Sequence, residues 1–194
     1  MVDVDGVVCI SPDGRNWAAD LGLSPETLQH AFFAPHFGDV IRGRAGLHER
    51  LAPVLEQVAP HLTAEALIAY WFEKDAHLDH TLLDDLAALR AAGVELHLAT
   101  IQEHLRADYL WTKLALRDRF DAMHYAADLG CLKPEPEFFA AITARTGFAP
   151  GELVLIDDKS ANVEGARAAG WGGALWDGTG RLAEVLARAG VRLP

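Results

Sequence analysis

The chain has 194 residues, enough for one compact α/β domain with a small insertion but not for two large domains. Hydrophobic residues make up 51% of it and charged residues 23%, a balance that excludes the intrinsically disordered class. The formal net charge of -11 makes nucleic acid and anionic membranes unsuitable partners, and it requires any site for an anionic metabolite to carry its own positive charge.

The sequence also indicates where the protein works. Its two cysteines, Cys9 and Cys131, make no disulfide framework, which favours a reducing compartment. The first residues contain no basic segment followed by an apolar run, and no stretch approaches the roughly 20 apolar residues of a membrane helix. We therefore expect a cytoplasmic protein without a signal peptide or a membrane span.

The first predicted strand spans Met1 to Val8 and is interrupted by two aspartates. Residues 11–75 then show a helical pattern that no strand pattern interrupts. Ser24 and Pro25 are typical of an N-cap and the first turn of a helix. Three apolar stripes at helical spacing follow: Leu28, Ala31 and Phe32; Leu47, Leu51, Val54, Leu55 and Val58; and Leu67, Tyr70 and Trp71. This pattern predicts a small all-helical insert.

Strands and helices alternate in the rest of the chain. The predicted strands are 94–100, 121–125, 153–156 and 172–176. The predicted helices are one that ends at Gly93, one over 103–115, one from Pro134 to just before Gly147, and two over 161–169 and 181–189. This order predicts an α/β fold with a doubly wound, Rossmann-like parallel sheet. We expect its core to comprise residues 1–10 and 76–194, with the helical insert, residues 11–75, placed after the first strand.

Polar residues stand near the expected C-terminal ends of these strands, where parallel sheets bind their ligands. They are Asp3, Asp5, Thr100, Lys133, Asp157 and Asp158. Burying several carboxylates together is unfavourable unless a cation neutralises them. Mg²⁺ is a hard ion that prefers oxygen ligands, so it would neutralise them and would also offset the acidic surface for a phosphate ligand.

These residues carry a resemblance to a known family. Asp3-x-Asp5-Gly6-Val7, the strand-terminal Thr100, Lys133-Pro134 before a helix, and Asp157-Asp158 followed by Asn162 resemble, in order and context, the four motifs of the haloacid dehalogenase superfamily. One such motif alone is weak evidence, but all four in order cover nearly the whole chain. The helical insert is similar to the small C1 cap of that family. The resemblance implies a Mg²⁺-dependent phosphohydrolase that acts on a small phosphorylated metabolite.

The resemblance also implies a role for each residue. Asp3 would be the nucleophile that forms an aspartyl-phosphate, and Asp5 the general acid and base. Thr100 and Lys133 would bind the phosphoryl oxygens. The Mg²⁺ ligands would be Asp3, Asp5 through its backbone carbonyl, and Asp158, with Asp157 and Asn162 as a further ligand or as support outside the ligand shell.

Each motif has a structural alternative when it is taken alone. Asp-x-Asp-Gly is common in turns, Lys133 could be a solvated loop residue, and Asp157 with Asp158 could begin a helix. Their joint occurrence favours the functional interpretation. The remaining candidates are less specific: His36 and Arg42 in the insert could contact the leaving portion of a substrate, whereas Cys9 and Cys131 are expected to be small core residues near the site.

Two features depart from the family pattern. Only two residues precede Asp3, fewer than in a strand of usual length, so the first strand is expected to be short or the chain to begin downstream of its natural start. Ile101 also stands where many members carry asparagine. A dehalogenase is disfavoured because Asp5 is present, and breaking a carbon–halogen bond needs no acid. A phosphomutase and a catalytically silent binding protein of the same fold remain alternatives.

Overall fold

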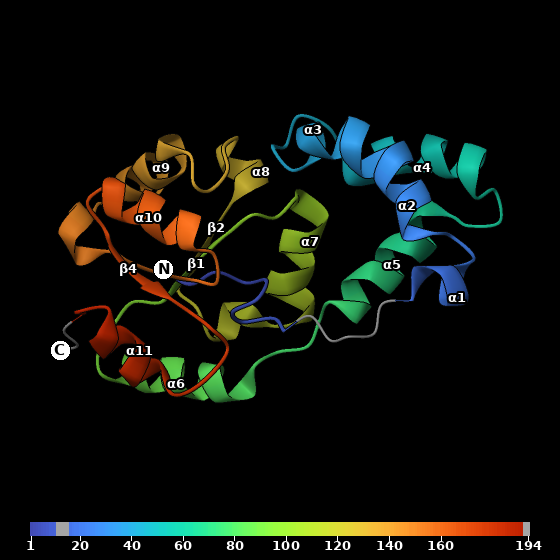
Figure 1. Cartoon of the computed structure of the whole chain (residues 1–194). Coiled ribbons are helices and arrows are strands. Elements are labelled where there is room, and N and C mark those ends of the chain that lie inside the picture. The colour runs from blue at the N-terminus through green and yellow to red at the C-terminus, as the bar shows by residue number, and fades with distance from the viewer. Residues whose placement is uncertain (11–15, 192–194) are drawn as a thin grey trace.

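The sheet is built from four short parallel strands and the first residues of the chain. In the computed structural model, which describes residues 1–10 and 16–191, the strands are β1 (His97–Thr100), β2 (Ala122–Tyr125), β3 (Val154–Asp157) and β4 (Gly172–Leu175). β1 pairs with β2, and β3 pairs with β4. Val2 joins the two pairs through parallel bridges to Leu98 and Ile156. The order across the sheet is therefore β2, β1, the N-terminal segment, β3, β4, and the chain starts at its centre (Figure 1).

The predicted first strand, Met1 to Val8, is wrong in its extent. Val2 and Asp3 donate their backbone N–H groups to the neighbouring strands on either side, over 2.8 and 2.9 Å. Beyond Asp3 the chain folds back on itself, because Val4 O accepts a hydrogen bond from Cys9 N at 2.7 Å. A local turn thus replaces the second half of the strand, but the strands on both sides still hold the residue before the turn.

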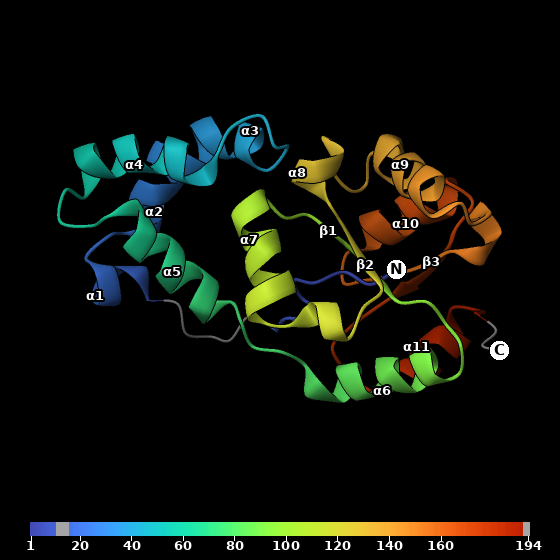
Figure 2. The same cartoon turned by 180° about the vertical axis from the view of Figure 1, so that it is seen from behind.

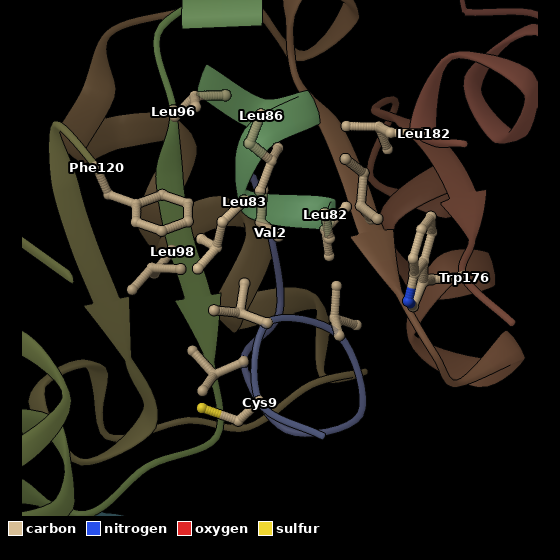
Figure 3. Close-up of a cluster of buried hydrophobic side chains, with 14 of the residues drawn as sticks. Val2, Cys9, Leu82, Leu83, Leu86, Leu96, Leu98, Phe120, Trp176 and Leu182 are labelled. Atoms are coloured by element: carbon tan, nitrogen blue, oxygen red, sulfur yellow. The ribbon is translucent and has the colours of Figure 1, made fainter. Parts of the chain in front are cut away.

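Helices cover both faces of this sheet (Figures 1 and 2). The helical segments of the core are α6 (His80–Ala91), α7 (His104–Asp108), η2 (Tyr109–Lys113), η3 (Leu116–Asp118), α8 (Ala126–Leu129), α9 (Pro136–Thr146), η4 (Pro150–Glu152), α10 (Ser160–Ala168) and α11 (Leu182–Arg188). Leu98 packs in a cluster with α6 and α11, whereas Ala99, its neighbour in β1, packs in a cluster with α9 and α10. Figure 3 shows Val2 in the first cluster beside Leu82 and Leu83 of α6. The predicted doubly wound α/β core is confirmed.

Two predicted helices differ in detail. The helix expected from Pro134 begins at Pro136, because the preceding residues form a turn in which Glu135 N donates to Leu132 O over 2.8 Å. The helix expected over 103–115 is divided into α7 and the π-helical η2.

The insert forms a separate helical subdomain, the cap, beside the core (Figure 1). Its segments are α1 (Trp17–Leu21), α2 (Pro25–Leu28), η1 (Gln29–Phe37), α3 (Gly38–Val40), α4 (Leu47–Val58) and α5 (Ala64–Lys74). Ser24 caps α2 as predicted, because its side chain accepts a hydrogen bond from Thr27 N at 3.1 Å. A single apolar cluster between Trp17 and Phe72 holds these helices together. The expected beginning of the cap, at residue 11, lies outside the described residues.

Both cysteines lie in the core. Cys9 is buried with the α6 cluster and Cys131 with the α9 cluster, as expected for small packing residues. Burial raises the pKa of the Cys9 thiol to about 12, so this side chain is an inert packing group. None of the helices in the described part of the chain is long and apolar enough to cross a lipid bilayer.

A buried histidine pair joins the neighbouring strands β1 and β2. His97 Nδ1 and His124 Nε2 are 3.1 Å apart, and His97 Nε2 is 3.2 Å from a carboxylate oxygen of Glu95. Burial, followed by repulsion from His97, lowers the pKa of His124 to about 4. Burial also lowers the pKa of His97. The folded protein therefore holds both rings neutral at a pH where an unfolded chain would begin to protonate them.

This pair should make the protein sensitive to acid. Below pH 6.5 the unfolded state takes up a proton on His124 that the folded state refuses until the pH reaches about 4, so stability falls as the pH falls through this window. The slope from this group is at most about 1.4 kcal/mol per pH unit. Urea unfolding at several pH values should show a shallower decline for His124→Gln than for wild type. His80→Gln, at an exposed position of α6, should leave the slope unchanged. Parallel curves for His124→Gln and wild type would contradict this assignment.

Candidate active site

A buried lysine joins three neighbouring strand ends. Lys133 Nζ lies 2.9 Å from Asp3 Oδ1 and 2.6 Å from Asp157 Oδ2, and it donates to the carbonyl oxygen of Ala99 over 2.9 Å. Asp3 follows the paired Val2, whereas Asp157 is the last residue of β3. The ammonium thus connects the centre of the sheet to the strand on each side of it, and its side chain is completely buried.

Asp157 is the carboxylate of this group that accepts the most hydrogen bonds. Besides Lys133, it accepts hydrogen bonds from the amide of Asn162, at 2.9 Å on Oδ1 and 3.1 Å on Oδ2, and from Lys159 N at 2.9 Å. Four interactions therefore occupy its two oxygens. This arrangement orients the lysine and leaves Asp157 little capacity for another partner.

Asp158 and Asp3 accept fewer hydrogen bonds from the described residues than Asp157 does. Asp158 Oδ1 is buried and has no hydrogen-bond partner among the described residues; the ammonium of Lys159, with which it forms a long ion pair, is 3.9 Å away. A Cβ atom on Gly6 would lie 2.5 Å from Asp158 Oδ2, so a glycine, here with a φ of +81°, lets this carboxylate approach the turn after Asp3. Oxygens of Asp3, Asp157 and Asp158 all lie within 4.8 Å of one another. Three clustered carboxylates with one orphaned oxygen suit a hard divalent cation.

The pKa of Asp3 also reflects its position in this buried cluster. Burial raises the pKa of Asp3 to about 6; the ammonium of Lys133 opposes this rise, and Asp157 adds to it. Asp3 Oδ1 also accepts a hydrogen bond from Val4 N at 2.8 Å. No hydrogen bond from a described residue engages the second oxygen, Oδ2, which leaves it free to act as a nucleophile or ligand.

Asp5 and Thr100 are linked by a residue that the sequence analysis does not single out. Gln102 Nε2 donates to Asp5 Oδ2 over 2.8 Å and lies 3.4 Å from Thr100 Oγ1. Gln102 is only 5% exposed, whereas Asp5 is exposed. Its position, two residues beyond the strand-terminal threonine, is the one sequence signal that could have identified it. The six polar residues predicted at the strand ends thus lie together at one edge of the sheet, and Gln102 lies with them.

A cavity of about 280 Å³ opens between this edge and the cap. Its walls are Asp5, Ile101, Gln102, Glu103 and Arg106 from the core, and Phe37, Ile41, Trp71, Phe72 and Asp75 from the cap and its C-terminal end. We refer to it as the cap–core cavity. Asp5, in the turn that follows Asp3, lines this cavity, whereas the other three cavities found in the described part of the chain contain neither Asp5 nor a residue of the carboxylate cluster. The cap–core cavity is therefore the candidate substrate site.

The two cap candidates lie outside this cavity. Arg42 makes a two-pronged ion pair with Glu135 of the core, at 2.9 and 2.5 Å, and this pair holds the pKa of Glu135 down to about 2. Arg42 therefore binds the cap to the core. His36 is half-buried against the ring of Phe32 in η1. Neither residue lines the cavity that contains Asp5.

Comparisons with known proteins agree with this fold. A family model described as haloacid dehalogenase-like hydrolase matches residues 1–170. A chloroplast flavin mononucleotide hydrolase of Arabidopsis thaliana is 33% identical over 64 residues, which are 33% of this chain and 26% of that protein. The matched part thus spans about a quarter of the length of that relative.

Solved structures with low sequence identity share the fold. A haloacid dehalogenase family enzyme of Bacteroides thetaiotaomicron, in complex with magnesium and inorganic phosphate, superposes with a TM-score of 0.79 at 20% identity and covers 94% of this chain and 96% of its own. A predicted hydrolase of the same family from Porphyromonas gingivalis has a TM-score of 0.72 at 19% identity, with 96% and 94% covered. A 2-haloacid dehalogenase of Pseudomonas syringae has a TM-score of 0.69 at 21% identity, with 96% of each chain covered.

The orphaned oxygen of Asp158 generates a prediction about metal binding. Asp158→Asn removes one charge from the cluster, so it should stabilise the metal-free protein by about 1 kcal/mol, or about 2–4 °C for a chain of this size. The same change should abolish any rise in melting temperature on adding Mg²⁺. Scanning calorimetry with and without the ion tests both. Glu164→Gln, at an exposed position of α10, should preserve the response to Mg²⁺. An undiminished response in Asp158→Asn would show that the ion binds elsewhere.

Proposed function

The chain belongs to the haloacid dehalogenase-like hydrolases, and on that premise we propose that it is a Mg²⁺-dependent phosphatase of small phosphate monoesters. The observation that carries the proposal is the buried ammonium of Lys133, which lies 2.9 Å from Asp3 and beside a carboxylate cluster suited to a divalent cation. A strongly acidic chain can bind a phosphate dianion only where such positive charge is concentrated. The flavin mononucleotide hydrolase of Arabidopsis thaliana, whose named substrate is a phosphate monoester, supports this reaction class.

Asp3 is the proposed nucleophile. Its Oδ1 is fixed by Val4 N and Lys133, so Oδ2 is the oxygen left to attack the substrate. Attack of Oδ2 on phosphorus forms an aspartyl-phosphate as the bond from phosphorus to the ester oxygen breaks, which divides one difficult displacement into two easier ones. Lys133 stabilises the charge on the phosphoryl oxygens, and the hydroxyl of Thr100 donates a hydrogen bond to one of them.

Asp5 is the proposed acid and base. In the first step its protonated carboxyl gives a proton to the departing ester oxygen; in the second its carboxylate takes a proton from the water that attacks phosphorus, which releases phosphate and regenerates Asp3. The hydrogen bond from Gln102 holds this side chain in one orientation through both steps. A carbon–halogen bond needs no acid for its leaving group, so a positioned Asp5 favours phosphate esters over haloacids.

The carboxylate cluster is the proposed magnesium site. Asp3, Asp158 and the backbone carbonyl of Asp5 would hold the ion, whereas Asp157, whose oxygens are already occupied, would orient Lys133 with the help of Asn162. When bound, Mg²⁺ neutralises the cluster and the phosphoryl charge.

Hydrolysis of para-nitrophenyl phosphate tests the nucleophile and the metal together. Wild type should turn over with Mg²⁺ and lose turnover with EDTA. Asp3→Asn should lower kcat by about a thousandfold or more, because the amide oxygen is a poor nucleophile, while circular dichroism stays unchanged. Asp177→Asn, at an exposed position after β4, should match wild type. Turnover that survives either EDTA or Asp3→Asn would refute the corresponding part of the proposal.

Leaving-group dependence tests Asp5. Asp5→Asn should reduce kcat about a hundredfold or more for an alkyl phosphate, whose alkoxide needs a proton to depart. The loss in the first step should be smaller for para-nitrophenyl phosphate, because nitrophenolate leaves without one. Single-turnover measurements of the released alcohol isolate that step. Equal losses for the two esters would count against the role of Asp5 as an acid.

A further inference from the structure

The size and lining of the cap–core cavity indicate which leaving groups the proposed phosphatase can accept; this inference rests on the proposed function. Asp5 lines this cavity, so the part of the substrate beyond the ester oxygen must occupy it. At about 280 Å³ it is at the small end of ligand sites. Its chemical lining therefore determines which small alcohols can be accepted.

One side of the cavity is a rigid aromatic wall. The ring of Trp71 lies 5.9 Å from that of Phe37 and 5.8 Å from that of Phe72, measured between centroids. The indole N–H of Trp71 donates to Asp75 Oδ2 over 2.9 Å, which fixes the plane of the ring. Ile41 completes this wall. Fixed apolar groups favour a leaving group that presents apolar surface or a cationic group to an aromatic face.

The charged groups of the cavity are mostly acidic. Of the described residues that line it, three are carboxylates, Asp5, Asp75 and Glu103, and one, Arg106, is a cation. Arg106 is buried and already occupied: it donates to the carbonyl oxygens of Phe72 and Asp75 over 2.8 and 2.6 Å. Its guanidinium is also stacked against the rings of Phe72 and Tyr109, at 5.2 and 5.3 Å.

Three cations outside the lining are engaged by carboxylates. Lys133 is bound to Asp3 and Asp157, Arg42 is bound to Glu135 on both of its terminal nitrogens, and Lys159 lies 3.9 Å from Asp158. A second phosphate or a carboxylate on a leaving group in the cavity would therefore lose its hydration without gaining an unpaired cation in the lining. Desolvating an unpaired anion beside carboxylates is strongly unfavourable.

We propose that the cap–core cavity selects phosphate monoesters whose leaving group is apolar or cationic and carries no negative charge, with Ile41 and Trp71 as specificity-determining residues. Phosphorylated acids, bisphosphates and nucleoside polyphosphates are then excluded by charge. Monoesters of small aromatic alcohols and of amino alcohols are accepted.

A matched substrate series tests the selection in wild type. The three probes are benzyl phosphate, 4-(aminomethyl)benzyl phosphate and 4-carboxybenzyl phosphate, in which a methylene group insulates the ester oxygen from the charged substituent. The neutral and cationic esters should have kcat/KM values about tenfold or more above that of the carboxylate ester. Equal values for the three esters would overturn the charge selection and leave the phosphatase assignment standing. If para-nitrophenyl phosphate is hydrolysed but none of the three esters is, the inference alone fails; if no phosphate ester is hydrolysed, the proposed function fails as well.

A single substitution should then weaken the preference. Ile41→Lys adds the missing cation to the aromatic wall, so it should raise kcat/KM for the carboxylate ester relative to benzyl phosphate by about tenfold and lower it for the amine. Val58→Lys adds the same charge to a 37% exposed position at the end of α4 and should leave the ratios unchanged. Thermal melting confirms that each variant folds. Unaltered ratios in a folded Ile41→Lys protein would show that the leaving group does not contact this wall, and would overturn the proposal.

Discussion

The buried ammonium of Lys133 is the interaction on which the rest of the site depends. It joins three adjacent segments of the sheet: Asp3 after the N-terminal segment, Ala99 in β1 and Asp157 at the end of β3. A fully buried cation is tolerated only when its hydrogen-bonding capacity is filled, and here two carboxylates and a carbonyl fill it. The lysine thereby fixes Asp3 relative to the neighbouring strand ends, although the N-terminal segment contributes very little strand of its own.

The lysine does not balance the charge around it. Asp158 adds a third carboxylate, whose buried oxygen lacks a hydrogen-bond partner among the described residues, and burial raises the pKa of Asp3. Such a cluster is unfavourable for the folded protein by itself and becomes favourable when a cation binds. The cluster therefore lowers stability locally at a site whose donor atoms suit a divalent cation.

The cap lines the cavity together with the core and is joined to the core by charged side chains. Arg42 binds Glu135, and the guanidinium of Arg106 donates to two carbonyls at the end of the cap, so charged contacts hold the two parts together. A Cβ on Gly43 would lie 2.2 Å from the carbonyl oxygen of Ala127, which shows how closely the chains approach there. Trp71 of the cap and Asp5 of the core both line the cavity between the two parts. The guanidinium groups of Arg42 and Arg106 are thus both engaged in joining the cap to the core.

The sequence by itself determined the fold class, the helical insert and six residues of the site, because these depend on local patterns: alternating elements, apolar spacing, and polar residues where strands end. It could not determine the length of the first strand, since the turn after Asp3 is stabilised by bonds that compete with the sheet. Nor could it find Gln102, or distinguish the occupied Asp157 from the unsatisfied Asp158, because both depend on which atoms meet across the fold. The sequence offers Arg42 only as a candidate substrate contact, and only the tertiary structure places Glu135, 93 residues away, within its reach. Residue types are local properties of a sequence, whereas the satisfaction of each polar atom is a property of the folded chain.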